Sequence, residues 1–100
     1  MQYTLSHSDE AIEISISGRL TFSDAPQFSK ILSELTAGAV RDWAIDLNGL
    51  EFIDSTGMSL FIHIYDSANA DGRQVVLRGS RGAAYEALDR AGFHTLFAFK

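Results

Sequence analysis

Apolar and polar residues alternate along the first part of the chain, a pattern that is typical of strands with one buried face. Tyr3-Thr4-Leu5 shows this alternation, and Ala11 to Ser17 repeats it with an isoleucine at every second position. The intervening Ser8-Asp9-Glu10 is polar and has the composition of a turn. We therefore expect two half-buried strands, which can pair as an antiparallel edge of a sheet.

Three later segments repeat apolar residues at the spacing of an amphipathic helix. The first begins at Ser23-Asp24-Ala25-Pro26, where a cap candidate precedes a proline, and ends at Gly38. The second runs from Met58 to Ala70, and the third from Gly82 to Ala91 with Gly92 as its stop. The side chains expected to face inward are Phe28, Ile31, Leu32 and Leu35, then Met58, Phe61, Ile62, Tyr65 and Ala68, and finally Tyr85, Leu88 and Ala91.

Short apolar runs separate these helices. Trp43 to Leu47, closed by Asn48-Gly49, predicts a buried strand, and Gln74 to Arg78 predicts another after the Asp71-Gly72 turn. The tail from Phe93 to Phe99 alternates in part and is compatible with a short edge strand. Strands and helices in this order need right-handed crossovers. The predicted fold class is therefore α/β, with a mixed, largely parallel sheet of four to five strands and helices packed on it.

Length and composition predict a single domain over residues 1–100, because this length supports one core and leaves no room for a second. Hydrophobic residues make up 46% of the chain and charged residues 21%, as in ordinary globular proteins. No apolar stretch approaches the roughly 20 residues that cross a bilayer, and Met1-Gln2-Tyr3-Thr4 lacks the features of a secretory signal. We expect a soluble, cytoplasmic protein.

The charge balance indicates the kind of partner. The formal net charge is −5 at pH 7, and the only lysines are Lys30 and Lys100. Nonspecific binding to nucleic acid depends on neutralising phosphates, and binding to an anionic membrane depends on clustered basic residues. We therefore expect neither nucleic acid nor direct membrane contact, and a protein surface is the expected target.

Asp54-Ser55-Thr56-Gly57 stands where the second helix begins and carries the chain's most informative chemistry. In one interpretation it is only a cap: Ser55 or Thr56 accepts a hydrogen bond from a free backbone N–H, Asp54 favours the positive helix end, and Gly57 lets the chain turn. In the other, its hydroxyls lie beyond the carboxyl ends of the strands, where functional loops gather, and serve as a phosphate switch. The tetrapeptide alone favours the cap.

The surrounding sequence changes that balance. Gly49 to Met58, preceded by Ile45-Asp46-Leu47, resembles the central signature of the STAS family, the sulfate-transporter and anti-sigma-factor-antagonist domain. The similarity extends upstream to Ile12–Leu20 and downstream through Val75-Val76-Leu77 to Ala91-Gly92-Phe93, so it covers nearly the whole chain. Within the family, the chain is most similar to the small stand-alone antagonist type.

This resemblance implies a partner and a cycle. Antagonists of this type, when unphosphorylated, bind an anti-sigma factor that is also a serine kinase and so free a sigma factor. The implied acceptor is Ser55, Thr56 is a secondary target, and a separate phosphatase removes the phosphate. The ATP belongs to the kinase, so no cofactor is expected in this chain.

Local electrostatics suggests how such a phosphate would act. It adds about −1.5 to −2 charges, which the positive end of a helix tolerates. A partner docked over the same helix end would meet like charge beside Asp54 and Glu51, which weakens binding. The expected partner-binding residues are Asp54, Ser55, Thr56, Gly57, Met58, Leu60, Thr21 and Asp24.

Some of these positions rest on separate considerations. Thr21 follows Gly18-Arg19-Leu20, at a position where antagonists of this type commonly carry an acidic residue, and Asp24 is close enough to substitute for it. Leu60 is expected near the polar side of its helix, and its apolar side chain is expected to contact a partner there. Packing against neighbouring elements is an equally strong interpretation for Met58 and Leu60.

Catalysis and metal binding are not expected. Ser55 and His63 on one helix are separated by about 12 Å along its axis, too far for proton transfer. The three histidines, His7, His63 and His94, lack the spacing of metal ligands. Asp46 is predicted to be a hydrogen-bonded structural carboxylate, because buried acids require partners.

One alternative function stays open at this point. Some STAS domains are accessory subunits of membrane transporters, of lipid-transport ATPases or of signalling scaffolds. These use the same helix face without a phosphorylation cycle, and the sequence alone does not separate the two functions.

Overall fold

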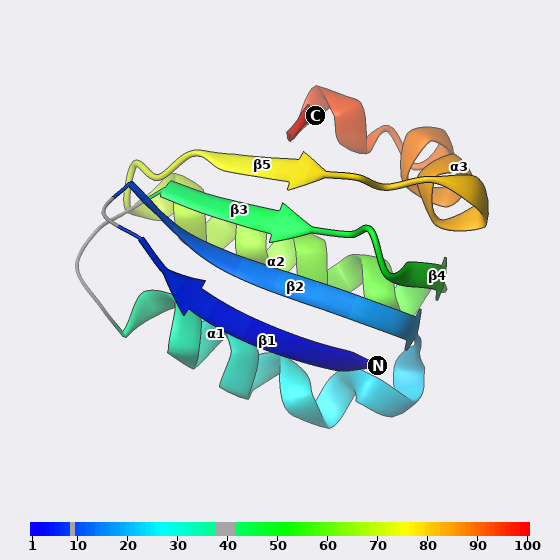
Figure 1. The fold of residues 1–100 in the computed structure, drawn as a ribbon, viewed down its shortest axis with the longest axis horizontal. Helices are drawn as coiled ribbons and strands as arrows, with labels where there is room; N and C mark the ends of the chain where they lie inside the picture. The colour runs from blue at the N-terminus through cyan, green and yellow to red at the C-terminus, as the bar shows by residue number, and fades with distance from the viewer. Residues whose placement is uncertain (9, 38–41) are drawn as a thin grey trace.

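The computed structural model describes residues 1–8, 10–37 and 42–100 and folds them into a sheet with helices α1 and α2 on one face (Figure 1). The turn expected at Asp9 and the helix end expected at Gly38 lie outside the described residues. In chain order the elements are β1 (Gln2–His7), β2 (Ala11–Leu20), the 3-10 helix η1 (Phe22–Gln27), α1 (Phe28–Thr36), β3 (Asp42–Asp46), β4 (Leu50–Ile53), α2 (Ser55–Ala70), β5 (Val75–Arg78), α3 (Gly82–Arg90), the 3-10 helix η2 (Phe93–Thr95) and β6 (Ala98–Phe99).

The sheet confirms the predicted fold class. Its strands are ordered β1-β2-β3-β5-β6, with β4 paired to β2. β1 pairs with β2 antiparallel, as expected, and the other pairings are parallel. Ile14, Ile45 and Leu77 are neighbours across the three central strands and are fully buried. The tail contributes the short edge strand β6, which pairs with β5.

Strand β4 is an addition that the sequence pattern did not predict. β3 pairs with the first half of β2, over Ala11–Ser15, while β4 pairs with its last residues, Gly18–Leu20. Within the pairing with β4 the register shifts between Gly18, opposite Leu50, and Arg19, opposite Phe52. Within the described residues the sheet therefore has six strands, against the four to five expected. Four residues are too few to show a period, so only the pairing with β2 identifies this strand.

The packed face of α2 differs from the predicted one. Leu60, expected near the polar side, is fully buried, whereas Ile62, expected inward, is 37% exposed. Met58 and Tyr65 are half-buried. Apolar residues cover an arc of this helix that is broader than its buried face, so their spacing alone does not fix its orientation. The buried residues of α2 are Gly57, Leu60, Phe61, Ile64 and Ala68.

Helices α1 and α3 give one agreement and one correction. The predicted stripe of α1 is confirmed: Phe28, Ile31 and Leu35 are buried, and the half-buried Leu32 packs against the core. In α3 the buried residues are Ala84 and Leu88, and Tyr85 and Ala91 are exposed, contrary to expectation. Tyr85 packs edge-on against Phe99, with 6.1 Å between the ring centroids, at the rim of the core. Gly92 follows α3 with φ +78°, as predicted for a helix stop.

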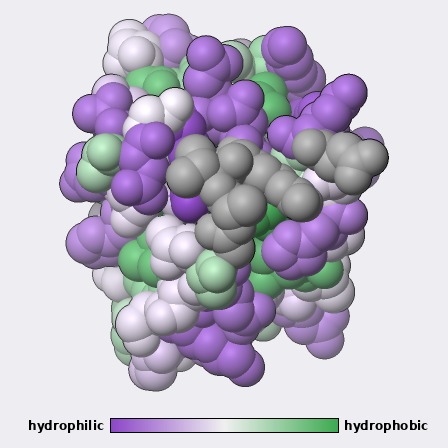
Figure 2. Space-filling view, turned by 90° about the vertical axis from the view of Figure 1, so that its left-hand side faces the viewer, coloured by the Kyte–Doolittle hydropathy of each residue, from purple (hydrophilic) through white to green (hydrophobic). Residues whose placement is uncertain are grey.

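The start of α2 and the surface drawn in Figure 2 lie at opposite ends of the molecule. Figure 2 shows the end away from the start of α2, where the visible apolar residues are separated by hydrophilic ones. β4 and the first turn of α2 lie at the opposite end (Figure 1). Across residues 1–8, 10–37 and 42–100, no helix has the length and apolar character needed to span a bilayer.

Candidate functional site

The first turn of α2 is capped by Asp54. Asp54 has an extended backbone, with φ −100° and ψ −178°, and its Oδ1 accepts a hydrogen bond of 2.7 Å from the backbone N–H of Gly57. The helix itself begins at Ser55. The expectation that Ser55 or Thr56 supplies the cap is therefore wrong, because both residues already lie inside the first turn. The carboxylate takes over that task and leaves the hydroxyls available.

Ser55 presents its side chain to solvent. The residue is exposed, and among the described residues its hydroxyl has no hydrogen-bond partner. Thr56 is half-buried, and its carbonyl oxygen accepts a hydrogen bond from the Ser59 hydroxyl. A modifying enzyme can thus reach Ser55 without displacing any described segment, which confirms the accessibility that the switch hypothesis requires.

Gly57 is needed for close packing and not for a turn. Its φ is not positive, so the expected role in turning the chain is wrong. A Cβ at this position would lie 2.5 Å from the backbone oxygen of Leu20 and 2.9 Å from Cγ1 of Ile53. The start of α2 therefore sits directly on the ends of β2 and β4, and this contact fixes where Ser55 lies.

The same carboxylate links α2 to η1. Oδ2 of Asp54 accepts a hydrogen bond of 3.0 Å from the backbone N–H of Phe22. β4 ends beside the end of β2, so the segments that follow these two strands begin next to each other. Residues that are 32 positions apart in sequence thus meet at one helix end.

Thr21 and Asp24 hold the start of η1. Oδ2 of Asp24 accepts a hydrogen bond of 2.9 Å from the backbone N–H of Thr21, and Oδ1 lies 2.9 Å from the terminal ammonium of Met1. Burial raises the pKa of Asp24, but the bonds from Thr21 and the ammonium outweigh it, so the pKa lies below its ordinary value. Asp24 is only 6% exposed. Contrary to expectation, its carboxylate is directed inward and does not replace a surface acid.

Two apolar positions near the site have different surroundings. Leu60 belongs to the core and offers no surface to a partner, so its expected place in the interface is corrected. Met58 is half-buried and packs against the core from its edge. Its role in binding stays a prediction.

Phe22 is the residue that the sequence pattern did not single out. Its side chain is 72% exposed, although its backbone N–H and that of Thr21 are bound by the carboxylates of Asp54 and Asp24. One signal was present in the sequence: Phe22 falls outside the apolar stripe of the following helix, which begins at Phe28. Its position beside Asp54 depends on the β2–β4 pairing, which the sequence did not disclose.

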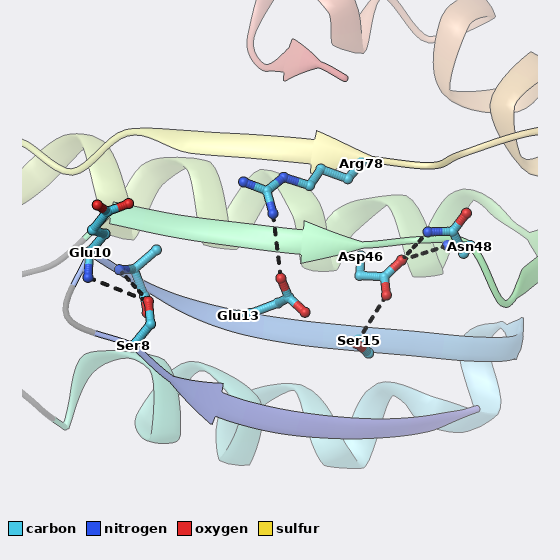
Figure 3. A network of polar contacts seen from close by, with 8 residues as sticks. Ser8, Glu10, Glu13, Ser15, Asp46, Asn48 and Arg78 are labelled. Atoms are coloured by element: carbon cyan, nitrogen blue, oxygen red, sulfur yellow. Dashed lines mark hydrogen bonds and ion pairs between the residues drawn. The ribbon is translucent and has the colours of Figure 1, made fainter.

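Asp46 lies in a separate polar network on the open face of the sheet (Figure 3). Its Oδ1 accepts hydrogen bonds from the backbone and the side chain of Asn48, at 2.9 and 2.7 Å, and Oδ2 accepts one from Ser15 at 3.3 Å. The backbone bond from Asn48 is the largest influence on the pKa of Asp46 and lowers it; burial opposes this, while the Asn48 amide, Ser15 and the charge of Arg78 add to it. The predicted structural role of Asp46 is confirmed.

Metal-ligating side chains do not gather at this site. Over the residues that the structure describes, no group of three His, Cys, Asp or Glu side chains is arranged to hold a metal ion. The chemistry available at the start of α2 is that of an accessible hydroxyl beside a carboxylate.

Known proteins resemble the chain both in sequence and in fold. The family model described as Mlab, STAS domain, matches residues 3–98. Among curated proteins, the chain is similar to the anti-sigma-B factor antagonist of Staphylococcus aureus, at 24% identity over 71 residues. That segment covers 71% of this chain and 66% of the relative, so the chain spans about two thirds of the length of the curated relatives it matches.

The fold is similar to two solved states of one protein. The anti-sigma factor antagonist SpoIIAA in its unphosphorylated form superposes with a TM-score of 0.76 at 21% identity, covering 99% of this chain and 87% of that one. The Bacillus cell fate determinant SpoIIAA in the phosphorylated form gives 0.74 at 19% identity, covering 99% and 91%. At these identities the likeness concerns the fold.

Proposed function

The chain belongs to the STAS domain family, and from this membership we propose that it is an anti-sigma-factor antagonist controlled by phosphorylation of Ser55. In this function the unphosphorylated chain binds an anti-sigma factor that is also a serine kinase, and the phosphorylated chain does not. The observation that carries the proposal is the exposed Ser55 hydroxyl, which has no partner among the described residues and stands in the first turn of α2.

The fold is expected to tolerate the phosphate. Asp54 occupies the N–H of Gly57 but leaves the earlier amides of the turn available to an anion. A negative group at a helix N-terminus is favoured by about 0.3–1 kcal/mol. The nearby carboxylate of Asp54 opposes this gain, so the net effect on stability is expected to be small.

The partner is expected to respond much more strongly than the fold. A phosphoserine carries about −1.5 to −2 charges near neutral pH, and it would stand beside the carboxylates of Asp54 and Glu51. Like charges brought together at an interface cost several kcal/mol. Because each 1.4 kcal/mol is a tenfold change in affinity, a partial clash is sufficient for control.

The known relatives support this proposal. The Staphylococcus aureus relative is named as an antagonist of the anti-sigma-B factor, and SpoIIAA has been solved with and without its phosphate. We extend this to the chain as a binding protein without catalytic activity of its own. Its proposed partners are the kinase and a phosphatase that acts on phosphorylated Ser55, and the cycle is proposed to run in the cytoplasm, where sigma factors act.

Phosphate mapping tests the proposal directly. The chain is incubated with ATP and, in turn, with each purified serine-kinase anti-sigma factor from the genome that encodes it, and the phosphate is located by mass spectrometry. We expect modification at Ser55 and none in Ser55→Ala. Absence of phosphate from Ser55 with every kinase would favour the accessory-subunit function instead.

A binding measurement completes the test. By titration calorimetry, Ser55→Asp is expected to bind the kinase at least tenfold more weakly than the wild-type chain, while its melting temperature stays nearly unchanged. Equal affinity of the two forms would refute the switch.

A further inference from the structure

The most exposed large apolar side chain in the described part of the molecule lies beside the switch serine. Phe22 is 72% exposed, whereas Ile62, Tyr85 and Leu96 are each less than half exposed. Single apolar residues on a surface are common and need no explanation. The position of Phe22 and the way its backbone is held distinguish it from the other three.

The backbone around Phe22 is fixed on both sides. The Phe22 N–H donates to Oδ2 of Asp54 at 3.0 Å, and the preceding N–H, that of Thr21, donates to Oδ2 of Asp24 at 2.9 Å. The hydroxyls of Thr21 and Ser23 lie 2.9 Å apart, on either side of the ring-bearing residue. These contacts fix the point at which the side chain leaves the backbone, and a phenylalanine has only two side-chain torsions to order on binding.

The ring and the switch hydroxyl share a single support. Asp54 holds Phe22 through Oδ2 and the first turn of α2 through Oδ1, and Ser55 follows it directly. A partner that covers the Ser55 hydroxyl therefore also lies against the Phe22 turn. Aromatic residues at the centre of an interface commonly contribute most of its binding energy.

We infer that Phe22 is the apolar anchor of the interface, and that it inserts into an apolar pocket on the serine-kinase anti-sigma factor that reads Ser55. This inference rests on the proposed function. Carboxylates lie near this turn, since Asp54 binds the backbone N–H of Phe22 and Glu51 stands on the strand that leads into α2, and the chain carries a net charge of −5. We therefore expect the pocket on the anti-sigma factor to have a basic rim. The charges would orient the two proteins, and the Phe22 ring would supply most of the affinity.

The test compares Phe22→Ala with the wild-type chain, using the kinase that phosphorylates Ser55. Calorimetry is expected to show at least a tenfold rise in Kd for Phe22→Ala, and phosphorylation kinetics a higher KM with kcat nearly unchanged. Phe22→Leu, which keeps an apolar side chain, is expected to recover most of the affinity. Because the ring is mostly exposed, unfolding in urea should be the same for all three proteins.

Salt dependence separates the anchor from the switch. The affinity lost in Phe22→Ala is apolar and should stay constant between about 50 and 500 mM salt, whereas the loss in Ser55→Asp is electrostatic and should shrink as salt screens it. The matched control is Leu96→Ala. Leu96 is also exposed, but it lines a pocket with Ala68 and Asn69 near the other end of α2, so its removal should change Kd less than twofold.

The outcomes distinguish this inference from the proposed function. If Phe22→Ala binds as tightly as the wild-type chain while Ser55→Asp binds weakly, the anchor is refuted and the switch stands. If Leu96→Ala loses as much affinity as Phe22→Ala, the anchor is likewise refuted, because the effect is not local. If no serine-kinase anti-sigma factor binds the wild-type chain, both ideas fall.

Discussion

Helices α2 and α3 begin at the same end of the sheet, each after a parallel strand, yet their first turns are built differently. α2 follows β4, and the carboxylate of Asp54 caps it with a hydrogen bond to its own first turn. α3 follows β5 and has Arg81 at the capping position, and the Arg81 side chain makes no capping hydrogen bond. Arg81 instead reaches the carbonyl oxygen of Asn48, at 3.1 Å.

The difference shows what makes the start of α2 suitable for a switch. At α2 the cap is local and the packing is tight, so a hydroxyl placed just inside the helix is free of structural duties. At α3 the start is supported from a distance, through Arg81 to Asn48 and from Asn48 to Asp46. Its only nearby serine, Ser80, precedes the capping position. Of these two helix starts, that of α2 is the one at which a modifiable group and a rigid support coincide.

The largest expected difference between the two helix starts concerns their glycines. Gly57→Ala would place a Cβ 2.5 Å from the backbone oxygen of Leu20, so we expect a loss of about 3 kcal/mol in unfolding free energy. Gly82→Ala meets open space and suffers only from its φ of +61°, which costs about 1 kcal/mol. Urea denaturation of both variants measures the two losses. Equal losses would mean that α2 is not tightly seated on β2.

The caps should differ next most strongly. Asp54→Ala removes the acceptor for both Gly57 and Phe22, and we expect a loss of about 1–2 kcal/mol. Arg81→Ala removes one exposed hydrogen bond and should cost less than about 0.5 kcal/mol. Denaturation midpoints at a constant m-value give both figures. If Arg81→Ala lost more stability than Asp54→Ala, the local cap of α2 would not be the stronger of the two supports.

Acid should weaken the distant support of α3 through Asp46. The hydrogen bonds from Asn48 lower the pKa of this carboxyl in the folded chain below the ordinary value of about 3.9. The stability it contributes is present above that value and is lost as the pH falls through the lowered pKa. The difference in unfolding free energy between the wild-type chain and Asp46→Asn should be constant from about pH 7 to 5 and shrink below about pH 4. A difference independent of pH would contradict this account.

The smallest expected effect is on the stability of the serine variants. Ser55→Ala and Ser80→Ala should each change the unfolding free energy by less than about 0.5 kcal/mol, because neither alters a cap or the core. Their response to the kinase should differ completely, since only Ser55→Ala should lose the phosphate. If phosphorylation persisted in Ser55→Ala and disappeared in Ser80→Ala, the acceptor would be Ser80 at the start of α3, and the assignment to Ser55 would be wrong.

Sequence alone determined most of the elements and their order. The alternation in β1 and β2, the apolar stripe of α1 and the glycine after α3 each express a local rule, because period and backbone freedom act over a few residues. The same local chemistry placed Ser55 at a helix start. For these features the neighbours in sequence are also the neighbours that matter in space.

Only the tertiary structure decided how the site is assembled. The pairing of β4 with the end of β2 brings Phe22 to Asp54 across 32 positions, and no local pattern records that contact. The packing of α2 on the sheet also turned Leu60 into the core, because it selects part of an apolar arc that is wider than the buried face. Long-range pairing fixes relative positions, and those positions decide which side chains remain at the surface.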